Sequence, residues 1–285
     1  MIKQKEINDK ALRWGVHPNT VDKDYALGHF LNAFYSFEEN KKLFVFKGET
    51  CLRKCYFPDY RFSEDLDFTL IDSNFKINQK FLKKIADECT RGSDILFGDV
   101  KIKSKIIHDN TQHISEFIIP FWGANHSKSS LLAPQERWIT QIELDFSSSE
   151  KIYTPIEHKT IFHQYSDEIL LKNHIPVYSI KEILIEKIRS FEQRKYKSAR
   201  DYYDVWYIMQ NVDFESWKGI GSLLQSKCVE KIITINPNIF EDMDRKEKLQ
   251  NSWESSLKNQ LKKLPEFESV WSYLRDNLFQ KLKLK

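Results

Sequence analysis

Two β-forming runs on either side of a glycine constrain this chain more than any other feature. The run KLFVFKG is apolar and rich in β-forming residues up to Gly48, which predicts a strand that ends there. The next stretch, ETCLRKCYF, favours a helix. EDLDFTLID then alternates acidic and apolar residues, which predicts a second strand. The segment therefore predicts a strand, a tight turn into a helix, and a second strand.

The second predicted strand carries two carboxylates at a spacing suited to metal binding. Asp65 and Asp67 are two residues apart, and the period of a strand places both side chains on one face. A later run, QIELDFSS, predicts a strand in which Glu143 and Asp145 share the face opposite Leu144. Three acids, Asp65, Asp67 and Asp145, can hold two Mg²⁺ ions about 3.5–4 Å apart. The alternative is that they are only the solvated face of a half-buried sheet.

Apolar spacing and capping residues predict further elements along the chain. A helix is expected over residues 18–37, with Thr20 as its N-cap. Ser179 is the expected N-cap of another helix, with Glu182 as its capping-box partner. Additional helices are expected over 78–89, 251–264 and 267–279, and additional strands over 98–108, 114–122 and 137–149.

The order of these elements and the composition of the chain limit the classes of protein to which it can belong. Residues 1–175 are expected to form an α+β domain with N-terminal helices, and residues 176–285 a helical domain. A net charge of only +3 argues against a protein that simply coats nucleic acid. The chain starts with polar residues, has no apolar run long enough to cross a bilayer, and spaces its four cysteines unlike a zinc site. We therefore expect a cytoplasmic protein with no membrane partner.

The stretch FKGETCLRKCYFPDYRFSEDLDFT resembles the opening motif of the AbiEii/AbiGii nucleotidyltransferase toxins, which belong to the DNA polymerase β-like nucleotidyltransferase superfamily. In that motif a strand is followed by Lys-Gly-Gly-Thr-x-Leu and then by Arg-x-Ser-x-Asp-hydrophobic-Asp. The matching residues here are Lys47, Gly48, Thr50, Leu52, Arg61, Ser63, Asp65 and Asp67. Glu49 departs from the motif, because it stands where the family has its second glycine.

Three further stretches extend the resemblance along most of the chain. GVHPNTVDKDYALGHFL is similar to the N-terminal helix motif of the family, with Lys23 near its centre. QIELDFSS resembles the later carboxylate strand, with Asp145 at the acidic position. VYSIKEILIEKIRSFEQRKYKSARDYYDVWYI resembles the helical signature of the family. Its matching residues are Lys187, Arg194, Arg200, Asp201 and Asp204.

The resemblance implies both a fold and an activity. The fold is a polymerase β-like domain with a small mixed sheet flanked by helices, followed by a helical C-terminal domain. The activity is metal-dependent transfer of a nucleoside monophosphate from an NTP to an acceptor, with release of pyrophosphate. Some members of the family add nucleotides to the 3′ end of tRNA, which stops translation, and are paired with an antitoxin that often carries a winged-helix domain. We therefore expect a toxin of a toxin–antitoxin or phage-defence system that uses Mg²⁺ or Mn²⁺ and modifies RNA at the tRNA 3′ end.

The resemblance also assigns roles to the matching residues. Asp65, Asp67 and Asp145 are expected to bind the metal ions, with Asp145 at the ion that activates the attacking hydroxyl. Lys187 is expected to join these three as a catalytic residue. The expected NTP-binding residues are Lys47, Gly48, Thr50, Arg61, Ser63 and Arg194. The expected supporting residues are Lys23, Arg200, Asp201 and Asp204.

Several of these residues also have a purely structural interpretation. Thr50 is otherwise a helix N-cap, and Ser63 otherwise ends a loop. Arg61 pairs either with phosphate or with a neighbouring acid. If one unbroken helix runs from Lys187 to Asp201, these two residues share a face of that helix. The basic residues along the helix then form either a stripe that follows an RNA backbone or a solvated surface.

Three other charged or titratable features are open to interpretation. Glu49 brings a carboxylate next to the expected phosphate turn, and we expect it to point away or to contact a basic residue, tuning rather than abolishing NTP affinity. Arg200 and Asp204 have the spacing of an ion pair that would hold a helix. The histidines between residues 108 and 174 lack close metal-ligand spacing and are interpreted as structural or surface residues.

Three other functions compete with an RNA-modifying toxin. A small-molecule nucleotidyltransferase of the antibiotic-modifying kind would use the same carboxylates. A metal-dependent nuclease would draw on Asp67, Glu143, Asp145 and Lys151, although their spacing is not the tight acid-x-Lys of such sites. A catalytically impaired homologue that only binds a partner would follow if Glu49 abolished NTP binding.

Overall fold

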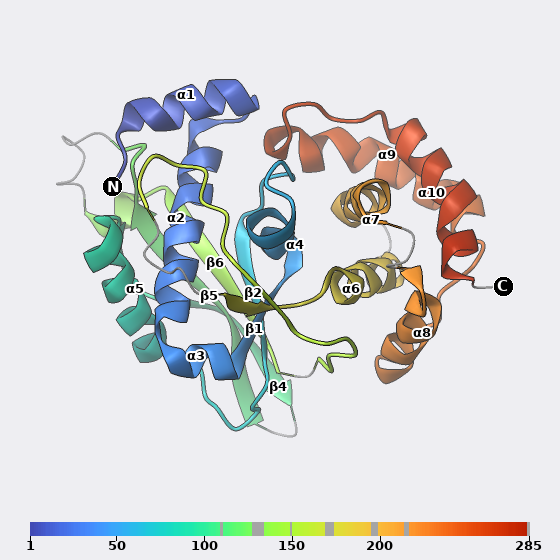
Figure 1. Cartoon of the computed structure of the whole chain (residues 1–285), viewed down its shortest axis with the longest axis horizontal. Helices are drawn as coiled ribbons and strands as arrows, with labels where there is room; N and C mark the ends of the chain where they lie inside the picture. Colours follow the sequence, from blue (N-terminus) through green and yellow to red (C-terminus); the bar gives the residue numbers. More distant parts are fainter. Residues whose placement is uncertain are drawn as a thin grey trace. The chain divides into compact units, whose positions relative to one another are not determined.

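The computed structural model of the chain describes residues 1–108, 111–126, 134–148, 150–168, 174–194, 199–213 and 217–283, without the side chains of 104–108 and 111–115. It contains two compact units. Unit 1 consists of Met1–Glu150 and Ile156–Val177, and unit 2 of Lys151–Pro155 and Tyr178–Lys285 (Figure 1). The division into domains 1–175 and 176–285 stays a prediction.

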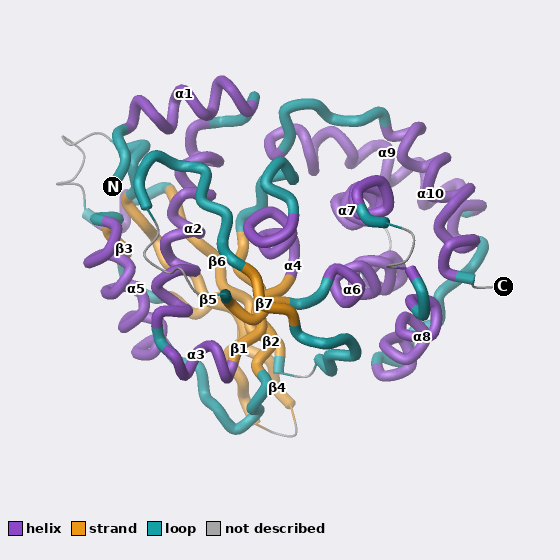
Figure 2. The backbone as a smooth tube through the Cα atoms, viewed as in Figure 1, coloured by secondary structure: helices purple, strands orange, loops and turns teal. Residues whose placement is uncertain are grey.

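Unit 1 mixes helices and strands, as its sequence patterns predict (Figure 2). Its described helices are α1 (Gln4–Trp14), α2 (Pro18–Ser36), α3 (Glu38–Leu43), α4 (Gly48–Cys51), the π-helical η1 (Leu52–Tyr56), α5 (Gln79–Ser93) and the 3₁₀ turn η3 (Gln135–Arg137). Its strands are β1 (Phe44–Lys47), β2 (Asp65–Leu70), β3 (Leu96–Phe97), β4 (Lys101–His108), β5 (Thr111–Trp122), β6 (Thr140–Ser147), β7 (Glu157–Lys159) and β8 (Ile175–Val177). The strand, helix and strand expected around the glycine are therefore confirmed.

The strands of unit 1 form one mixed sheet in the order β3-β5-β6-β2-β1-β8-β7, with β4 also paired to β5. The central strand β2 runs antiparallel to β1 and parallel to β6. On the other side of β1, β8 runs parallel to it. A mixed sheet flanked by helices confirms the expected α+β fold class.

Alternation along the central strands gives the sheet an aromatic face and an acidic face. Phe68 lies opposite Phe46 of β1 and Phe146 of β6, so these rings share one face. Phe34 of α2 stacks on Phe68 with ring centroids 4.5 Å apart. Helices α2 and α5 lie side by side against the sheet (Figure 1). Burial of this aromatic face stabilises unit 1.

Helix α2 begins at the first residue of its expected range, but its N-cap is His17 and not Thr20. Its first residue is Pro18, and Nδ1 of His17 accepts a hydrogen bond from the backbone N–H of Asn19 at 3.1 Å. Proline at the first helical position already has the φ of a helix and lacks the N–H that would need a partner. The prediction of Thr20 as N-cap is therefore wrong, since Thr20 lies inside the helix.

Unit 2 is helical among its described residues, as the last third of the sequence predicts (Figure 2). Its elements are α6 (Ile180–Gln193), α7 (Ala199–Asn211), α8 (Ile220–Glu230), η6 (Ile239–Glu241), α9 (Met243–Leu257), η7 (Lys258–Gln260) and α10 (Phe267–Leu282). The ring of Tyr202 stacks on Phe191 and Trp271, with centroid distances of 3.9 Å and 5.8 Å. This aromatic stack ties α6, α7 and α10 together.

The start of α6 confirms one half of the expected capping box. The side chain of Ser179 accepts a hydrogen bond from the N–H of Glu182 at 3.1 Å. The carboxylate of Glu182 does not reach back to close the box. It accepts hydrogen bonds from the N–H groups of Tyr153 and Thr154, at 3.1 Å and 2.9 Å, and pairs with Lys227 at 2.5 Å. A buried lysine is thus a stronger partner for Glu182 than the helix terminus.

The expected single helix from Lys187 to Asp201 is interrupted. Helix α6 ends at Gln193 and α7 begins at Ala199. Lys187 and Arg189 are 8% and 5% exposed, so they do not present a basic stripe to an RNA. Lys195 and Lys197, two more basic residues of this stretch, lie outside the described residues.

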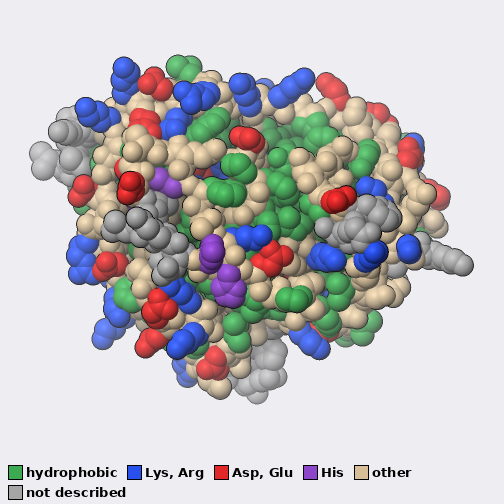
Figure 3. Space-filling view, viewed as in Figure 1, with side chains coloured by type: hydrophobic (Ala, Val, Ile, Leu, Met, Phe, Trp, Pro, Cys, Tyr) green, Lys and Arg blue, Asp and Glu red, His purple; other side chains and the backbone are tan. Residues whose placement is uncertain are grey.

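The surface of the protein mixes charges of both signs. On the face seen in Figure 3, acidic and basic side chains are interspersed, in keeping with the small net charge. Within the described parts of the chain, no helix is both long enough and apolar enough to span a membrane. The four cysteines are free thiols and buried.

Candidate active site

Strand register assembles the acidic face of unit 1. In the parallel pair of β2 and β6, Asp65 lies opposite Glu143, and Asp67 opposite Asp145. In the antiparallel pair of β5 and β6, Glu116 lies opposite Asp145. Side chains at facing positions of one sheet face lie close together. The three carboxylates singled out in the sequence therefore meet on adjacent strands, together with two further acids.

These acids line a small cavity of about 120 Å³. Lys103 lines the same cavity. Lys103 donates a hydrogen bond to Glu143 and lies 3.9 Å from Glu116. This contact lowers the pKa of Glu143 below its usual range even though burial acts in the opposite direction. The sequence analysis did not find Lys103, because nothing in its local pattern separates it from other strand lysines.

Asp65 and Asp67 are hard to ionise in this setting. Burial, followed by the negative charges of Glu49 and Glu143, raises the pKa of Asp65 to about 6. Burial, followed by the charges of Glu49 and Asp145, raises the pKa of Asp67 well above its usual range. Like charges held together in a partly desolvated site oppose one another's ionisation. A bound cation would remove this repulsion.

The glycine turn is fitted to the carboxylate of Asp67. Gly48 has φ +78°, in the left-handed region that favours glycine. A Cβ at this position would lie 2.1 Å from Oδ2 of Asp67, which is far inside van der Waals contact. Lys47 is the register partner of Asp67 across β1 and β2, and its charge lowers the pKa of Asp67 against the other contributions. Gly48 is therefore required both by the turn and by its acidic neighbour.

Thr50 and Ser63 are both buried beside this turn. The hydroxyl of Thr50 donates a hydrogen bond to the backbone carbonyl of Asp65, which ties the start of α4 to the start of β2. Ser63 is 4% exposed. The N-cap of α4 is Lys47, without a side-chain cap, so the interpretation of Thr50 as an N-cap is wrong.

Glu49 contacts a basic residue, as the sequence analysis expects. Its Oε1 lies 3.2 Å from Nη2 of Arg61. The Arg61 side chain is fully buried, whereas that of Glu49 is 14% exposed. Of the two partners left open for Arg61, the structure gives it the neighbouring acid.

The predicted supporting residue Lys23 also lies near the acids. Its Nζ is 3.3 Å from Oε2 of Glu64, and its charge favours the ionised forms of Asp65 and Glu143. The next residue, Asp24, is buried and accepts hydrogen bonds from three side chains, at 2.7–2.8 Å. Those donors are Arg53, Lys54 and Tyr165. Asp24 thus anchors η1 and the loop of Tyr165 to α2, next to the site.

The remaining predicted residues belong to unit 2, where three of them form a buried cluster. Nζ of Lys187 lies 2.8 Å from Asp201 and 2.9 Å from Asp204, and all three side chains are buried. The guanidinium of Arg194 is 3.5 Å from Asp201 and 60% exposed. Asp204 is therefore paired with Lys187 inside the unit, and not in the expected surface pair with Arg200, which is exposed.

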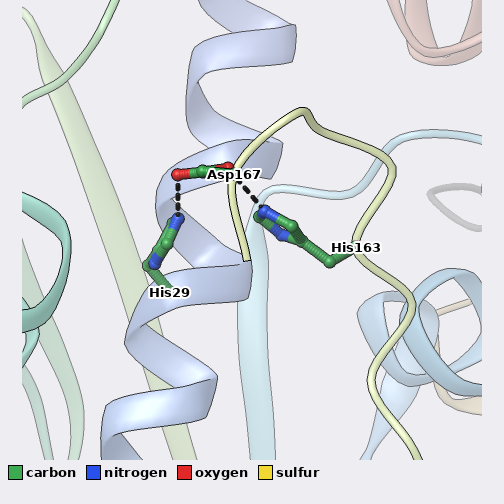
Figure 4. Close-up of side chains that lie close together, drawn as sticks. All are labelled: His29, His163 and Asp167. Atoms are coloured by element: carbon green, nitrogen blue, oxygen red, sulfur yellow. Dashed lines mark hydrogen bonds and ion pairs between the residues drawn. The ribbon is translucent and has the colours of Figure 1, made fainter. Parts of the chain in front are cut away.

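Unit 1 also contains a second group of residues whose side chains can bind a metal ion. These residues lie outside the acidic strands. His29 and His163 lie on either side of Asp167, within hydrogen-bonding distance of its carboxylate (Figure 4). The sequence analysis missed this group. His29 stands on α2 and the other two on a distant loop, so no spacing rule links them.

The acidic face has the donor chemistry of a divalent-metal site. Carboxylate oxygens are the ligands that Mg²⁺ and Mn²⁺ favour, and adjacent strands place Asp65, Asp67 and Asp145 on one face. Burial and the neighbouring acids raise the pKa values of Asp65 and Asp67, and a bound cation would oppose both effects. The residues present therefore fit the expected metal ions.

Comparison with known proteins agrees with this geometry. A family model for the nucleotidyl transferase AbiEii toxin of type IV toxin–antitoxin systems matches residues 29–276. No curated protein matches the chain significantly. MenT4, a nucleotidyltransferase toxin from Mycobacterium tuberculosis H37Rv, is similar in fold, with a TM-score of 0.64 and 17% identity over 100% of this chain and 91% of that one. A protein from H. pylori described as a nucleotidyltransferase has a TM-score of 0.44 and 16% identity over 98% of both chains.

The family match spans most of the chain, and it includes the glycine turn, the acidic strands and α6 and α7. It confirms the resemblance drawn from the sequence motifs. The chain belongs to the AbiEii family of nucleotidyltransferase toxins.

Proposed function

We propose that this toxin transfers a nucleoside monophosphate from an NTP to RNA, at the 3′ end of tRNA, and thereby blocks translation. The observation that carries the proposal is the register that places Asp67 beside Asp145 and Asp65 beside Glu143 on adjacent strands. Membership of a nucleotidyltransferase toxin family supplies the reaction class. The choice of tRNA rests on the resemblance of the motifs alone.

Asp65, Asp67 and Asp145 are the proposed ligands of Mg²⁺ or Mn²⁺. When bound, the metal ions would neutralise charge on the triphosphate and activate the attacking hydroxyl. The carboxylates themselves fix where cations can stand, because Asp67 and Asp145 face each other across two hydrogen-bonded strands. We also propose that Asp145, the acid on the second strand, takes the proton from the acceptor hydroxyl.

The turn at Gly48 is the proposed phosphate contact. Because Gly48 has no side chain, the backbone of the turn can lie against the carboxylate of Asp67, and we propose that an NTP phosphate contacts the backbone N–H groups of this turn. Lys47 supplies a positive charge on the same face of the sheet. Arg61, which is already paired with Glu49, is proposed to hold the turn, and Ser63 is proposed to line it.

The roles of the unit 2 residues remain predictions. The pairing of Lys187 with Asp201 and Asp204 supports a part in ordering α6 against α7. Arg194 is the exposed cation of this cluster, so we propose it for contact with phosphate groups of NTP or RNA. The family implies an antitoxin partner, and we propose one with a winged-helix domain.

The direct test is transfer of label from each α-³²P-labelled NTP to total tRNA with Mg²⁺. We expect labelled, lengthened tRNA with the unaltered protein, and none with Asp67→Ala or with EDTA. Absence of transfer from all four NTPs across the full tRNA pool would refute the proposal. Label on a small molecule and never on RNA would identify the small-molecule enzyme instead, and shortened RNA would identify a nuclease.

The geometry gives less support to the competing functions. A nuclease built with Lys151 finds no support in the contacts of that residue, whose Nζ lies over the ring of Tyr153, 5.0 Å from its centroid, in unit 2. An impaired homologue was suggested by Glu49, but the carboxylate of Glu49 is engaged by Arg61. The RNA-directed transferase is therefore the function that we put forward.

A further inference from the structure

The cluster of His29, His163 and Asp167 in unit 1 plays no part in the proposed transfer reaction. Nε2 of His29 lies 3.2 Å from Oδ2 of Asp167, and Nε2 of His163 lies 2.8 Å from Oδ1. Figure 4 shows the carboxylate between the two rings, with one nitrogen of each ring turned toward it. The three donor groups come from α2 and from the loop over residues 160–168.

We propose that these three residues form a binding site for a borderline divalent cation of the Zn²⁺ class. Two imidazole nitrogens and one carboxylate are a donor set that Zn²⁺ binds well and that Mg²⁺, which takes oxygen ligands, does not. This site is chemically distinct from the all-carboxylate face of the sheet. Its role is to fasten the loop to α2.

The spacing of the donor atoms suits one ion. Zn²⁺ binds nitrogen and oxygen at about 2.0–2.2 Å, so neighbouring ligand atoms lie roughly 2.8–3.5 Å apart for angles between 90° and 109°. The distance from His29 to the carboxylate falls inside this range, and that from His163 lies close to its lower end. One ligand atom from each of the three residues lies within 4.8 Å of the other two.

Burial and neighbouring contacts hold the ligands in place. The side chains of His29 and His163 are 5% and 8% exposed, and that of Asp167 is 26% exposed, which leaves room for a water ligand. Tyr25 donates a hydrogen bond to Asp167 at 2.5 Å, as an outer-shell residue would to orient a ligating carboxylate. Lys54, the cation close to His163, is compensated by Asp24 at 2.8 Å.

The loop that carries His163 and Asp167 has neither helix nor strand over residues 160–168. Its other contacts with the rest of unit 1 include the hydroxyl of Tyr165, which donates a hydrogen bond to the carbonyl of Val21 at 3.1 Å. A metal ion would add a strong fastening to such a segment.

Binding of Co²⁺ and Zn²⁺ to the full chain tests the site. The protein is stripped with EDTA, dialysed, and titrated in excess Mg²⁺, which occupies the carboxylate face but does not compete for imidazole. We expect one equivalent of Co²⁺ with visible d–d bands from nitrogen ligation, displaced by one equivalent of Zn²⁺. His29→Gln, His163→Gln and Asp167→Asn are each expected to weaken binding at least tenfold.

The exposed His158 provides a matched control, since His158→Gln removes an imidazole that lies outside the cluster. This variant is expected to bind Co²⁺ like the unaltered protein. The melting temperature with and without Zn²⁺ distinguishes loss of a metal ligand from loss of folding. Zn²⁺ should raise the melting temperature of the unaltered protein and of His158→Gln, but not that of Asp167→Asn. The proposal is overturned if the unaltered protein binds neither ion, or if it and the cluster variants bind equally.

Discussion

Glu49 and Arg61 form an ion pair, 3.2 Å from Oε1 to Nη2, at the point where the glycine turn meets the acidic strands. The carboxylate therefore occupies a position beside the expected phosphate while being held by a fully buried guanidinium. It also carries the largest charge contribution to the raised pKa values of Asp65 and Asp67. The one residue that departs from the family motif thus adds negative charge to the site and fixes Arg61 in the same contact.

Replacing Glu49 should change NTP affinity. Glu49→Gln removes a charge that repels triphosphate, so we expect tighter NTP binding by a few-fold, measured by calorimetry in an Asp145→Asn background that prevents turnover. Glu49→Gly, which restores the family pattern, should act in the same direction. Both variants should lose about 1–3 kcal/mol of stability, because Arg61 loses a partner for its buried charge. Unchanged affinity in both would place Glu49 beyond the reach of the phosphates.

Gly48→Ala should disrupt the site more than the fold. The new Cβ would lie 2.1 Å from Oδ2 of Asp67, so the carboxylate must move away from the turn. We expect a loss of transfer activity of at least about 100-fold, in line with the effect of small misplacements in catalytic sites. Gly219→Ala is a matched control in unit 2, since Gly219 has nearly the same φ, +77°, but no atom within 4 Å of the added Cβ. Both variants should lose about 1 kcal/mol in urea unfolding, while only Gly48→Ala loses activity.

Asp145 and Glu143 can be told apart by removing one charge at a time. They are two residues apart on the same face of β6, but Asp145 faces Asp67 whereas Glu143 is paired with Lys103. Asp145→Asn should lower the rate of NTP transfer about 1,000-fold or more, and Glu143→Gln by less than about tenfold. Single-turnover rates with saturating Mg²⁺ provide the measurement. Equal losses in the two variants would contradict the assignment of Asp145.

Asp65 should make the stability of the metal-free protein depend on pH. Its folded pKa is raised from 3.8 to about 6, so the folded state holds a proton that the unfolded state releases between these values. The contribution of the Asp65 carboxyl group to the free energy of unfolding is therefore fully present below about pH 4. It is lost as the pH rises through 6. Asp65→Asn should be more stable than the unaltered protein by about 1–3 kcal/mol at pH 8, with the difference disappearing near pH 4. Urea unfolding in EDTA at the two pH values checks the sign, and an advantage that grows toward low pH would contradict it.

Variants of Lys187 and its acidic partners can distinguish a structural role of Lys187 from a catalytic role. Lys187→Met leaves the carboxylates of Asp201 and Asp204 buried beside an apolar side chain, so we expect a loss of about 3–5 kcal/mol. Adding Asp201→Asn and Asp204→Asn should restore most of that stability, since all three charges are then gone. If transfer activity returns with stability, Lys187 acts only through the fold. Activity that stays absent in the stable triple variant would support the catalytic role predicted for it.

The central strands could be predicted from sequence because their faces are so unlike. Phe68 and Phe146 alternate with Asp67 and Asp145, and a period of two admits only one way to bury the rings. The register between the two strands could not be predicted in the same way. It depends on long-range pairing, and the sequence places both strands without saying which residue faces which.

Elsewhere, tertiary contacts override local signals. Thr20 has the preferences of an N-cap, but Pro18 starts the helix before it. Glu182 has the spacing of a capping box, yet a buried lysine, Lys227, takes its carboxylate. The cluster around Asp167 could not be predicted for a different reason, since His29 lies far from His163 and Asp167 in the chain and meets them only when the loop packs on α2.

The parallel pairing of β2 with β6 also bears on when the toxin becomes active during its own synthesis. Asp67 and Asp145 are separated by more than seventy residues, so β2 leaves the ribosome well before its acidic partner exists. Non-local parallel pairing of this kind forms slowly compared with local structure. A nascent or prematurely terminated chain that stops short of β6 therefore carries the glycine turn and two of the acids but no complete site. We therefore expect the proposed active site to be complete only after most of unit 1 has been translated and folded.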